Sequence, residues 1–220
     1  MLWSVFGSGA TAAEVALAIL AFICAITIAL VMHEFAHAFA AWKSGDPTAK
    51  MMGRMSLNPA RHVEPLGLLS FVIVGIGWAK PVPVNPFNYR NFKWGNFWVS
   101  IGGVLTNFVL GFVFSLCFFV VHSFANLDNY GNILLWHFFR FATVINIALM
   151  IFNLLPIPPL DGYNLLRSFT KPNNQFMQFL RNYAMIILIV VLIISMTTGG
   201  IFHLVNGIIW MFNSLWGVIF

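Results

Sequence analysis

Residues 15–37 read VALAILAFICAITIALVMHEFAH, and this stretch decides the fold class. Its first 18 residues, 15–32, carry no formal charge and are long enough to cross a hydrocarbon core of about 30 Å as a helix. The next five residues place two histidines and a glutamate at the end of that helix. The stretch therefore predicts a membrane-spanning helix that ends in a cluster of ionisable side chains.

The composition of the whole chain agrees with a membrane protein. Of the 220 residues, 60% are hydrophobic and 8% are charged, whereas soluble domains have about 25% charged residues. Eleven basic and six acidic side chains cannot cover the surface of a soluble enzyme of this size. The high hydrophobicity excludes a disordered chain. The basic residues are scattered rather than arranged in a stripe, so we expect no nucleic-acid partner.

Further uncharged runs follow the first one, and they define the domain organisation. We expect an all-α multi-pass membrane protein with about four to five transmembrane helices, folded as a single integral-membrane domain over residues 1–220. Its core covers 12–165, and hydrophobic helices cover 183–220. Sequence alone leaves open whether 201–220 spans the membrane or lies at its surface. The runs lie at 99–121, at 141–157 with an earlier start near Asn132, and at 183–220 with a break at 197–200.

One uncharged segment, residues 65–79, is too short to span. At about 1.5 Å per helical residue, 15 residues do not cross the core. We therefore expect a re-entrant or short extended hairpin segment over 65–90. If the chain enters the membrane here and returns, all basic residues except Arg140 lie on one side, whereas a spanning segment would divide them. The positive-inside rule makes that side cytoplasmic.

The motif His33-Glu34-Phe35-Ala36-His37 has the spacing of a zinc site. Positions four apart share one face of a helix, so both imidazoles can bind one metal ion. Glu34 lies beside that face and can hold a water molecule on the metal. Zn²⁺ bound by three protein ligands keeps a fourth position for water, and Glu34 can take a proton from it. Ionisable groups at membrane depth are costly unless they are paired or functional.

Asp161 is the candidate for the third ligand. It follows the sequence Asn153-Leu-Leu-Pro-Ile-Pro-Pro-Leu-Asp161, whose prolines end the preceding helix, and we expect Gly162 to form a tight turn that aims the carboxylate back into the bundle. With 65–79 re-entrant, Asp161 returns to the membrane side of His33 and His37. Charge distribution and chemistry thus favour the same topology.

Together these motifs resemble the site-2 protease family of intramembrane metalloproteases, peptidase family M50. Residues 56–65 (SLNPARHVEP) and 77–85 (GWAKPVPVN) also resemble its compact prokaryotic branch, which lacks PDZ and CBS domains. The resemblance implies one zinc ion bound by His33, His37 and Asp161, with Glu34 as catalytic base. It further implies hydrolysis of peptide bonds within transmembrane segments of other membrane proteins, in a prokaryotic cell membrane and near its cytoplasmic side. Glu64 in place of the usual Asp, and Gly102-Gly103 in place of an Ala-Gly-Pro lead-in, depart from the pattern without touching a proposed ligand.

Two further sets of residues are candidates for supporting roles. Asn107 and Asn153 are amides within spans, and each could stabilise an oxyanion, orient a ligand or link helices by hydrogen bonds. The second set reads as extended chain that could bind an unwound substrate by strand addition, or could be a rigid loop. It consists of Lys80, Pro81, Val82, Pro83, Val84 and Asn85.

Two other functions compete with a protease. A transporter could use intramembrane His, Glu and Asp for ion coupling, but no inverted repeat is evident. A metal-binding protein without proteolytic activity could act as a regulator. For a protease, the expected partners are substrates with a transmembrane helix and the lipid bilayer. A second copy of the chain or a regulatory membrane protein could also take part.

Overall fold

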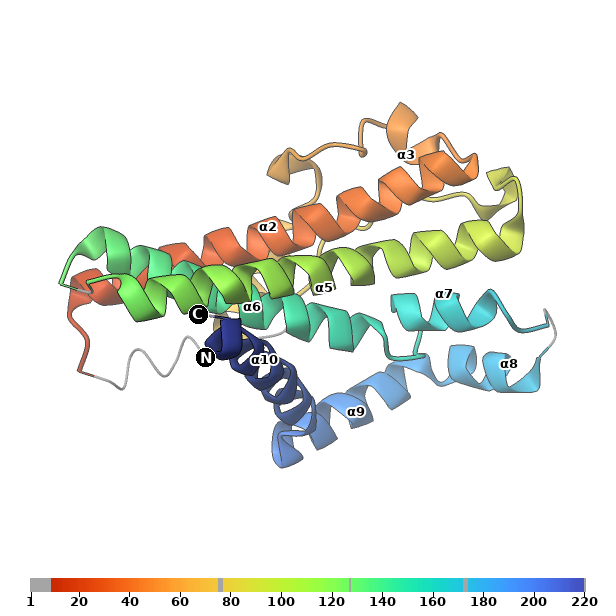
Figure 1. The fold of residues 1–220 in the computed structure, drawn as a ribbon. Coiled ribbons are helices and arrows are strands. Elements are labelled where there is room, and N and C mark those ends of the chain that lie inside the picture. The colour runs from red at the N-terminus through yellow and green to blue at the C-terminus, as the bar shows by residue number, and fades with distance from the viewer. Residues whose placement is uncertain (1–8, 75–76, 127, 172–173, 220) are drawn as a thin grey trace.

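The computed structural model describes residues 9–74, 77–126, 128–171 and 174–219, and every regular element within these ranges is helical (Figure 1). This confirms the all-α prediction. The elements are α2 (Ala12–Ser44), α3 (Thr48–Met51), η1 (Pro59–Arg61), α4 (Pro65–Val74), η2 (Pro86–Asn88), α5 (Phe92–Phe124), α6 (Tyr130–Asn153), α7 (Asp161–Arg167), α8 (Gln175–Asn182), α9 (Ala184–Thr198) and α10 (Gly200–Ile219).

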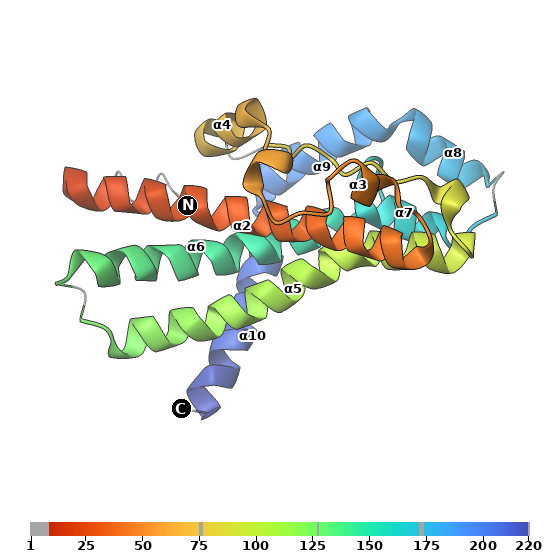
Figure 2. The ribbon, with the colours of Figure 1, turned by 90° about the horizontal axis from the view of Figure 1, so that it is seen from above.

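Three long helices, α2, α5 and α6, form the core of the molecule, with α5 antiparallel to the other two (Figures 1 and 2). Small side chains let their backbones approach closely, which is how helices commonly associate in membranes. On α2 the buried face includes four alanines beside the larger Phe22 and Ile26. On α5 a buried stripe consists of four residues spaced four apart, and therefore on one helix face. These are Ala18, Ala21, Ala25 and Ala29 on α2, and Gly103, Asn107, Gly111 and Ser115 on α5.

Helix α4 is the expected re-entrant segment. It has 10 residues and lies beside α2, where the Phe71 ring packs 5.8 Å from that of Phe22. The chain then runs back to the end of the bundle where α2 stops, and the N–H of Arg90 donates a hydrogen bond to the carbonyl of Ser44. The prediction that α2 ends and α5 begins at the same end of the bundle is confirmed.

The C-terminal part has the predicted break. Helix α9 ends at Thr198, and Gly199 adopts a left-handed conformation (φ 69°) before α10 begins. Helices α2, α5, α6 and α10 are each long and apolar enough to cross a membrane, and α8 with α9, bent by 71°, forms a fifth candidate. Figures 1 and 2 show α10 crossing the long helices steeply. Trp216 anchors it by donating a hydrogen bond to Ser115 of α5.

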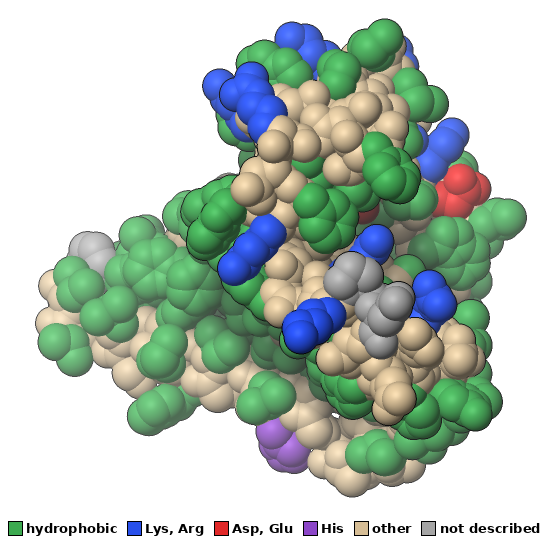
Figure 3. Space-filling model, turned by 90° about the vertical axis from the view of Figure 1, so that its right-hand side faces the viewer, with side chains coloured by type: hydrophobic (Ala, Val, Ile, Leu, Met, Phe, Trp, Pro, Cys, Tyr) green, Lys and Arg blue, Asp and Glu red, His purple; other side chains and the backbone are tan. Residues whose placement is uncertain are grey.

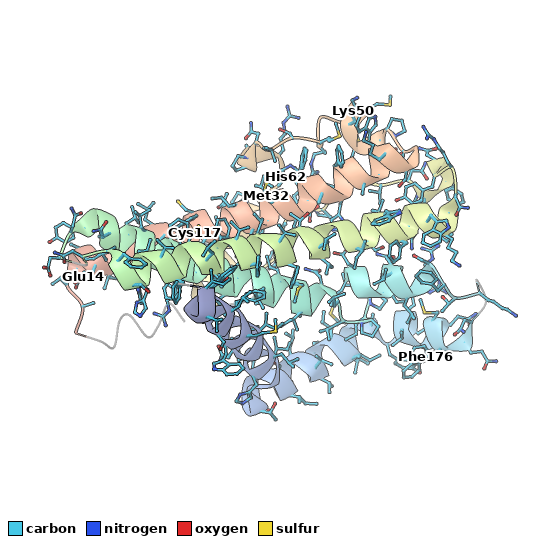
Figure 4. The ribbon with its side chains drawn as sticks, in the orientation of Figure 1. Glu14, Met32, Lys50, His62, Cys117 and Phe176 are labelled. Carbon is cyan, nitrogen blue, oxygen red and sulfur yellow. The ribbon has the colours of Figure 1, made fainter. Side chains whose placement is uncertain are left out.

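The two ends of the bundle differ in charge. Glu14 lies at one end and Lys50 at the other (Figure 4). Figure 3 looks onto the second end, and lysine and arginine side chains surround it. This end holds the termini of the helices that carry the zinc motif and Asp161.

Candidate metal centre

Two histidines on α2 form one side of the site. His33 and His37 are buried one helical turn apart, and their Nε2 atoms are 2.9 Å from each other. The spacing of four therefore places both imidazoles on one face, as predicted. Met32, labelled in Figure 4, directly precedes them and marks the level of the site along the bundle.

Asp161 forms the other side, and it reaches the histidines by a different route from the predicted turn. It is the first residue of α7, and Gly162 lies in the first turn of that helix without a positive φ. The tight turn expected at Gly162 is therefore wrong. The glycine is needed for close packing, because a Cβ there would lie 2.2 Å from the carbonyl oxygen of Leu154. This contact holds the start of α7 against the end of α6.

The three side chains fit a zinc ion. Asp161 Oδ2 lies 3.3 Å from Nε2 of His33 and 3.3 Å from Nε2 of His37. Ligand atoms about 2.0–2.1 Å from a tetrahedral zinc ion are about 3.3–3.4 Å from one another. Both distances from Asp161 match this value, and the 2.9 Å between the two Nε2 atoms is slightly shorter. Asp161 Oδ2 is buried and has no hydrogen-bond partner among the described residues, which suits a metal ligand. One carboxylate and two imidazoles also form a donor set that zinc prefers.

Both imidazoles are also held through their second ring nitrogen, Nδ1. The Nδ1 atom of His33 lies 2.6 Å from Oδ1 of Asn107, and that of His37 lies 2.7 Å from the carbonyl oxygen of Val99. Each of these oxygens accepts a hydrogen bond from a protonated Nδ1, which leaves the Nε2 lone pair free for a metal.

Gly103 of α5 leaves room for the two rings, which motivates a first prediction. A Cβ at this position would lie 2.6 Å from Cε1 of His33 and 2.6 Å from Nε2 of His37. We expect Gly103→Ala to lower zinc affinity by at least about tenfold and to destabilise the fold by about 1–3 kcal/mol through overpacking. Zinc competition titration and thermal unfolding of the purified protein would measure both effects.

Gly102 supplies the matched control for this prediction. A Cβ there would meet Ala36 and Ala40 at ordinary contact distances, 3.5 and 3.6 Å. Gly102→Ala should therefore retain zinc affinity. Equal zinc affinity in both alanine variants would contradict the steric role of Gly103.

Glu34 lies in the same cavity, next to the histidines. The cavity has a volume of about 940 Å³ and is lined by His33, Glu34, His37, Asn153 and Asp161 together with apolar residues from several helices. The Oε2 atom of Glu34 accepts a hydrogen bond of 2.8 Å from the N–H of Val82. The proposed base thus faces the cavity with one oxygen oriented by the extended segment.

The extended segment, residues 80–85, is anchored at four points, one of which is the hydrogen bond of 2.8 Å from the N–H of Lys80 to the carbonyl of His62. Nη2 of Arg54 donates to the carbonyls of Lys80 and Pro81, at 2.6 and 3.1 Å. Val82 contacts Glu34, and the N–H of Asn85 donates to Oδ2 of Asp46 at 2.6 Å. The segment therefore forms a fixed wall of the cavity.

Asp46 is the anchor with the largest number of hydrogen bonds. Its carboxylate is completely buried and accepts from the N–H of Asn85, from Asn88 Nδ2 and from Thr48. Burial alone would raise the pKa of Asp46, but these hydrogen bonds lower it more, so the pKa lies below its ordinary value. The ionised form is thus the one that the fold stabilises.

A second prediction follows for Asp46. Because its pKa is lower in the folded than in the unfolded state, its stabilising effect is present above the unfolded pKa of about 3.9 and is lost as the pH falls through the lower folded value. We expect the thermal unfolding midpoint of the wild type to fall more steeply below about pH 4 than that of Asp46→Asn. Asp128→Asn, in an exposed loop at the opposite end, is the control, and its unfolding midpoint should follow that of the wild type. Parallel curves for all three proteins would contradict the prediction.

The structure separates the two asparagines proposed from sequence. Asn107 contacts His33, whereas Asn153 lines the cavity and its Nδ2 donates to Leu149 of its own helix. Sequence reasoning missed Asp46, Arg54 and Asn146. Asn146 is a fully buried amide within α6, and that unusual placement of a polar residue in a span is the signal that could have identified it.

The comparisons with known proteins agree with this geometry. The chain is 36% identical over 148 residues to the Bacillus subtilis protein named "Putative zinc metalloprotease YwhC", covering 67% of this chain and 68% of the relative. The model of peptidase family M50 matches residues 120–195, which include Asp161. The chain belongs to this family.

Two relatives of lower identity cover more of the chain. The Mycobacterium tuberculosis H37Rv protein Rip2, which carries the same zinc metalloprotease description, is 28% identical over 197 residues, covering 84% of this chain and 70% of its own length. The Mycolicibacterium smegmatis Rip2 is 29% identical over 192 residues with the same two shares. No solved structure matches the chain. Its membership in M50 and its apolar helices make it a membrane-embedded zinc metalloprotease.

Proposed function

We propose that this M50 member is an intramembrane endopeptidase that hydrolyses peptide bonds within transmembrane segments of other membrane proteins. One zinc ion per chain is held by His33, His37 and Asp161, and Glu34 is the catalytic base. The observation that carries the proposal is the convergence of these four side chains in one cavity surrounded by apolar, membrane-length helices. A soluble substrate would not need a site within such helices.

The chain's own residues supply the proton transfers. When bound, zinc would polarise the scissile carbonyl and lower the pKa of a water molecule from 15.7 towards about 7. Glu34 accepts a proton from the water molecule as the water oxygen bonds to the carbonyl carbon. It then passes a proton to the amide nitrogen as the C–N bond breaks, leaving a carboxyl group and an amine. The hydrogen bond from Val82 keeps the carboxylate of Glu34 in position for both transfers.

The extended segment is suited to bind the unwound substrate. Alternate residues of an extended chain point their N–H and C=O groups to the same side, so Val84 offers its backbone to the same edge as Val82. No backbone partner from the described residues pairs with the N–H of Val84. Pro81 and Pro83 have no N–H, which blocks strand pairing on the opposite edge. We propose that substrate adds as a strand along this edge and pairs with the backbone of Val84, while the N–H of Val82 stays bonded to Glu34.

The direction of the chain supports a cytoplasmic location of the site. Lysine and arginine side chains surround the end of the bundle where α2 stops, and the positive-inside rule assigns such an end to the cytoplasm (Figure 3). We propose a multi-pass protein of a prokaryotic cell membrane, whose substrates have a transmembrane helix. The bilayer delivers these substrates, and a second copy or a regulatory membrane protein could control access.

Reconstitution tests this function directly. Purified protein in liposomes with zinc receives a model substrate with one transmembrane helix, or a soluble extended peptide of the same cleavable sequence. We expect cleavage within the membrane segment, located by mass spectrometry of the products, and its loss on zinc chelation. Cleavage of the soluble peptide alone, with the membrane segment intact, would refute an intramembrane endopeptidase.

A further inference from the structure

Behind His33, two buried asparagines connect the metal site to the backbone of α6. Asn107 Oδ1 lies 2.6 Å from Nδ1 of His33, and Asn107 Nδ2 donates to Oδ1 of Asn146 at 2.8 Å. Asn146 Nδ2 then donates to the carbonyl oxygen of Ala142, also at 2.8 Å. Both asparagines have zero exposure, so no solvent competes for these bonds.

The carbonyl of Ala142 determines the donor and the acceptor in each hydrogen bond between it and His33. A backbone carbonyl can only accept, so Asn146 must turn its NH₂ group towards Ala142 and its oxygen towards Asn107. Asn107 must then donate with its NH₂ group and accept from His33 with its oxygen. As a result Nδ1 of His33 carries a proton, and Nε2 presents its lone pair to the metal position.

The two histidines are held in different ways in the tautomer that carries its proton on Nδ1. A single contact with the carbonyl of Val99 fixes the tautomer of His37, because a carbonyl oxygen can only accept a hydrogen bond. His33 depends on an amide that can rotate by 180° and would then present a donor to Nδ1. In that orientation the favoured tautomer carries its proton on Nε2, where the metal binds. Something must therefore hold Asn107 in its orientation.

We infer that Asn146 is a positioning residue for His33, an inference that rests on the zinc peptidase function proposed above. Through Asn107 it selects the metal-binding tautomer of a ligand that it does not touch. The carbonyl of Ala29 lies 3.4 Å from Asn107 Nδ2, longer than the 2.8 Å bond to Asn146. Asn146 thus supplies the shorter of the two acceptors that orient Asn107.

A pair of substitutions at position 146 separates this role from simple helix association. Asn146→Leu has the same number of side-chain heavy atoms, branched at Cγ, but offers no acceptor to Asn107, whereas Asn146→Asp retains an acceptor. We expect the zinc dissociation constant, measured by chelator competition in detergent, to rise about 10–100-fold in Asn146→Leu and to change much less in Asn146→Asp. Ser115→Ala, which loses a buried interhelical bond on α5 away from the zinc site, should bind zinc like the wild type.

A rescue experiment and a direct measurement complete the test. In an Asn107→Asp background both oxygens accept, so orientation no longer matters and Asn146→Leu should cause no further loss of zinc affinity. In the wild-type protein without zinc, ¹⁵N NMR of labelled histidine should show Nδ1 of His33 protonated, which needs no variant to fold. An unprotonated Nδ1, or equal zinc affinities of Asn146→Leu and Asn146→Asp, would overturn the inference. Failure of the wild type itself to bind zinc would instead refute the proposed function.

Discussion

Glu34→Gln is expected to reduce hydrolysis of a transmembrane substrate by about 10²–10⁴-fold while zinc content stays unchanged. Glutamine has nearly the shape of glutamate, and its Oε1 can still accept the hydrogen bond from Val82. It cannot accept a proton from water. Glu34 is also not one of the three side chains whose ligand atoms converge, so zinc binding should survive. The initial cleavage rate in liposomes and the zinc content per chain measure the two effects separately.

The same substitution elsewhere on α2 is the control for Glu34→Gln. Glu14→Gln lies at the far end of this helix, and glutamine can serve in the capping box that Glu14 forms with Thr11. It should cleave at the wild-type rate. Cleavage by Glu34→Gln at the wild-type rate would exclude Glu34 as the base, whatever its effect on zinc.

The double variant His33→Ala/His37→Ala is expected to lose zinc altogether. Asp161 alone supplies one carboxylate, which does not hold a structural or catalytic zinc ion. A ligand that binds only the folded state raises the free energy of unfolding of the protein by RT ln(1 + [L]/Kd). Zinc should therefore raise the thermal unfolding midpoint of the wild type and leave that of the double variant unchanged. Asp161→Asn, with two ligands retained, should show an intermediate shift.

A second pair of histidines controls for the number of substitutions. His122 and His203 are exposed and do not line the cavity, so His122→Ala/His203→Ala should keep the zinc-dependent stabilisation. Undiminished zinc in the His33/His37 variant would show that the metal binds elsewhere.

The sequence was sufficient to predict the membrane helices, and it named four candidate site residues that the structure brings together in one cavity. Charge-free runs predicted α2, α5 and α6, because a helix in lipid needs a long apolar stretch that is visible along the chain. The spacing of His33 and His37 depends only on helical geometry. Asp161 followed from the scarcity of acidic residues and from the side of the membrane that the charges assign to it.

The contacts around the site could not be predicted, because they join residues that are distant in sequence. The turn expected at Gly162 was wrong because the requirement on this glycine comes from the backbone of Leu154, not from its own φ angle. Asp46 meets Asn85 39 positions away, and Asn107 meets Asn146 across the same separation. Neither pairing has a local pattern, since each depends on how two helices or loops are packed.

The stripe on α5 has a consequence for genetic studies of this protein. Gly103 and Asn107 serve the metal site, while Gly111 and Ser115 hold α6 and α10, and all four occupy one face of one helix. Random mutagenesis selected for lost proteolysis should therefore recover alleles along the whole face. Only measurement of protein abundance in the membrane would divide them into stable but inactive chains and chains removed by quality control. A map of such alleles would outline the inner wall of the enzyme.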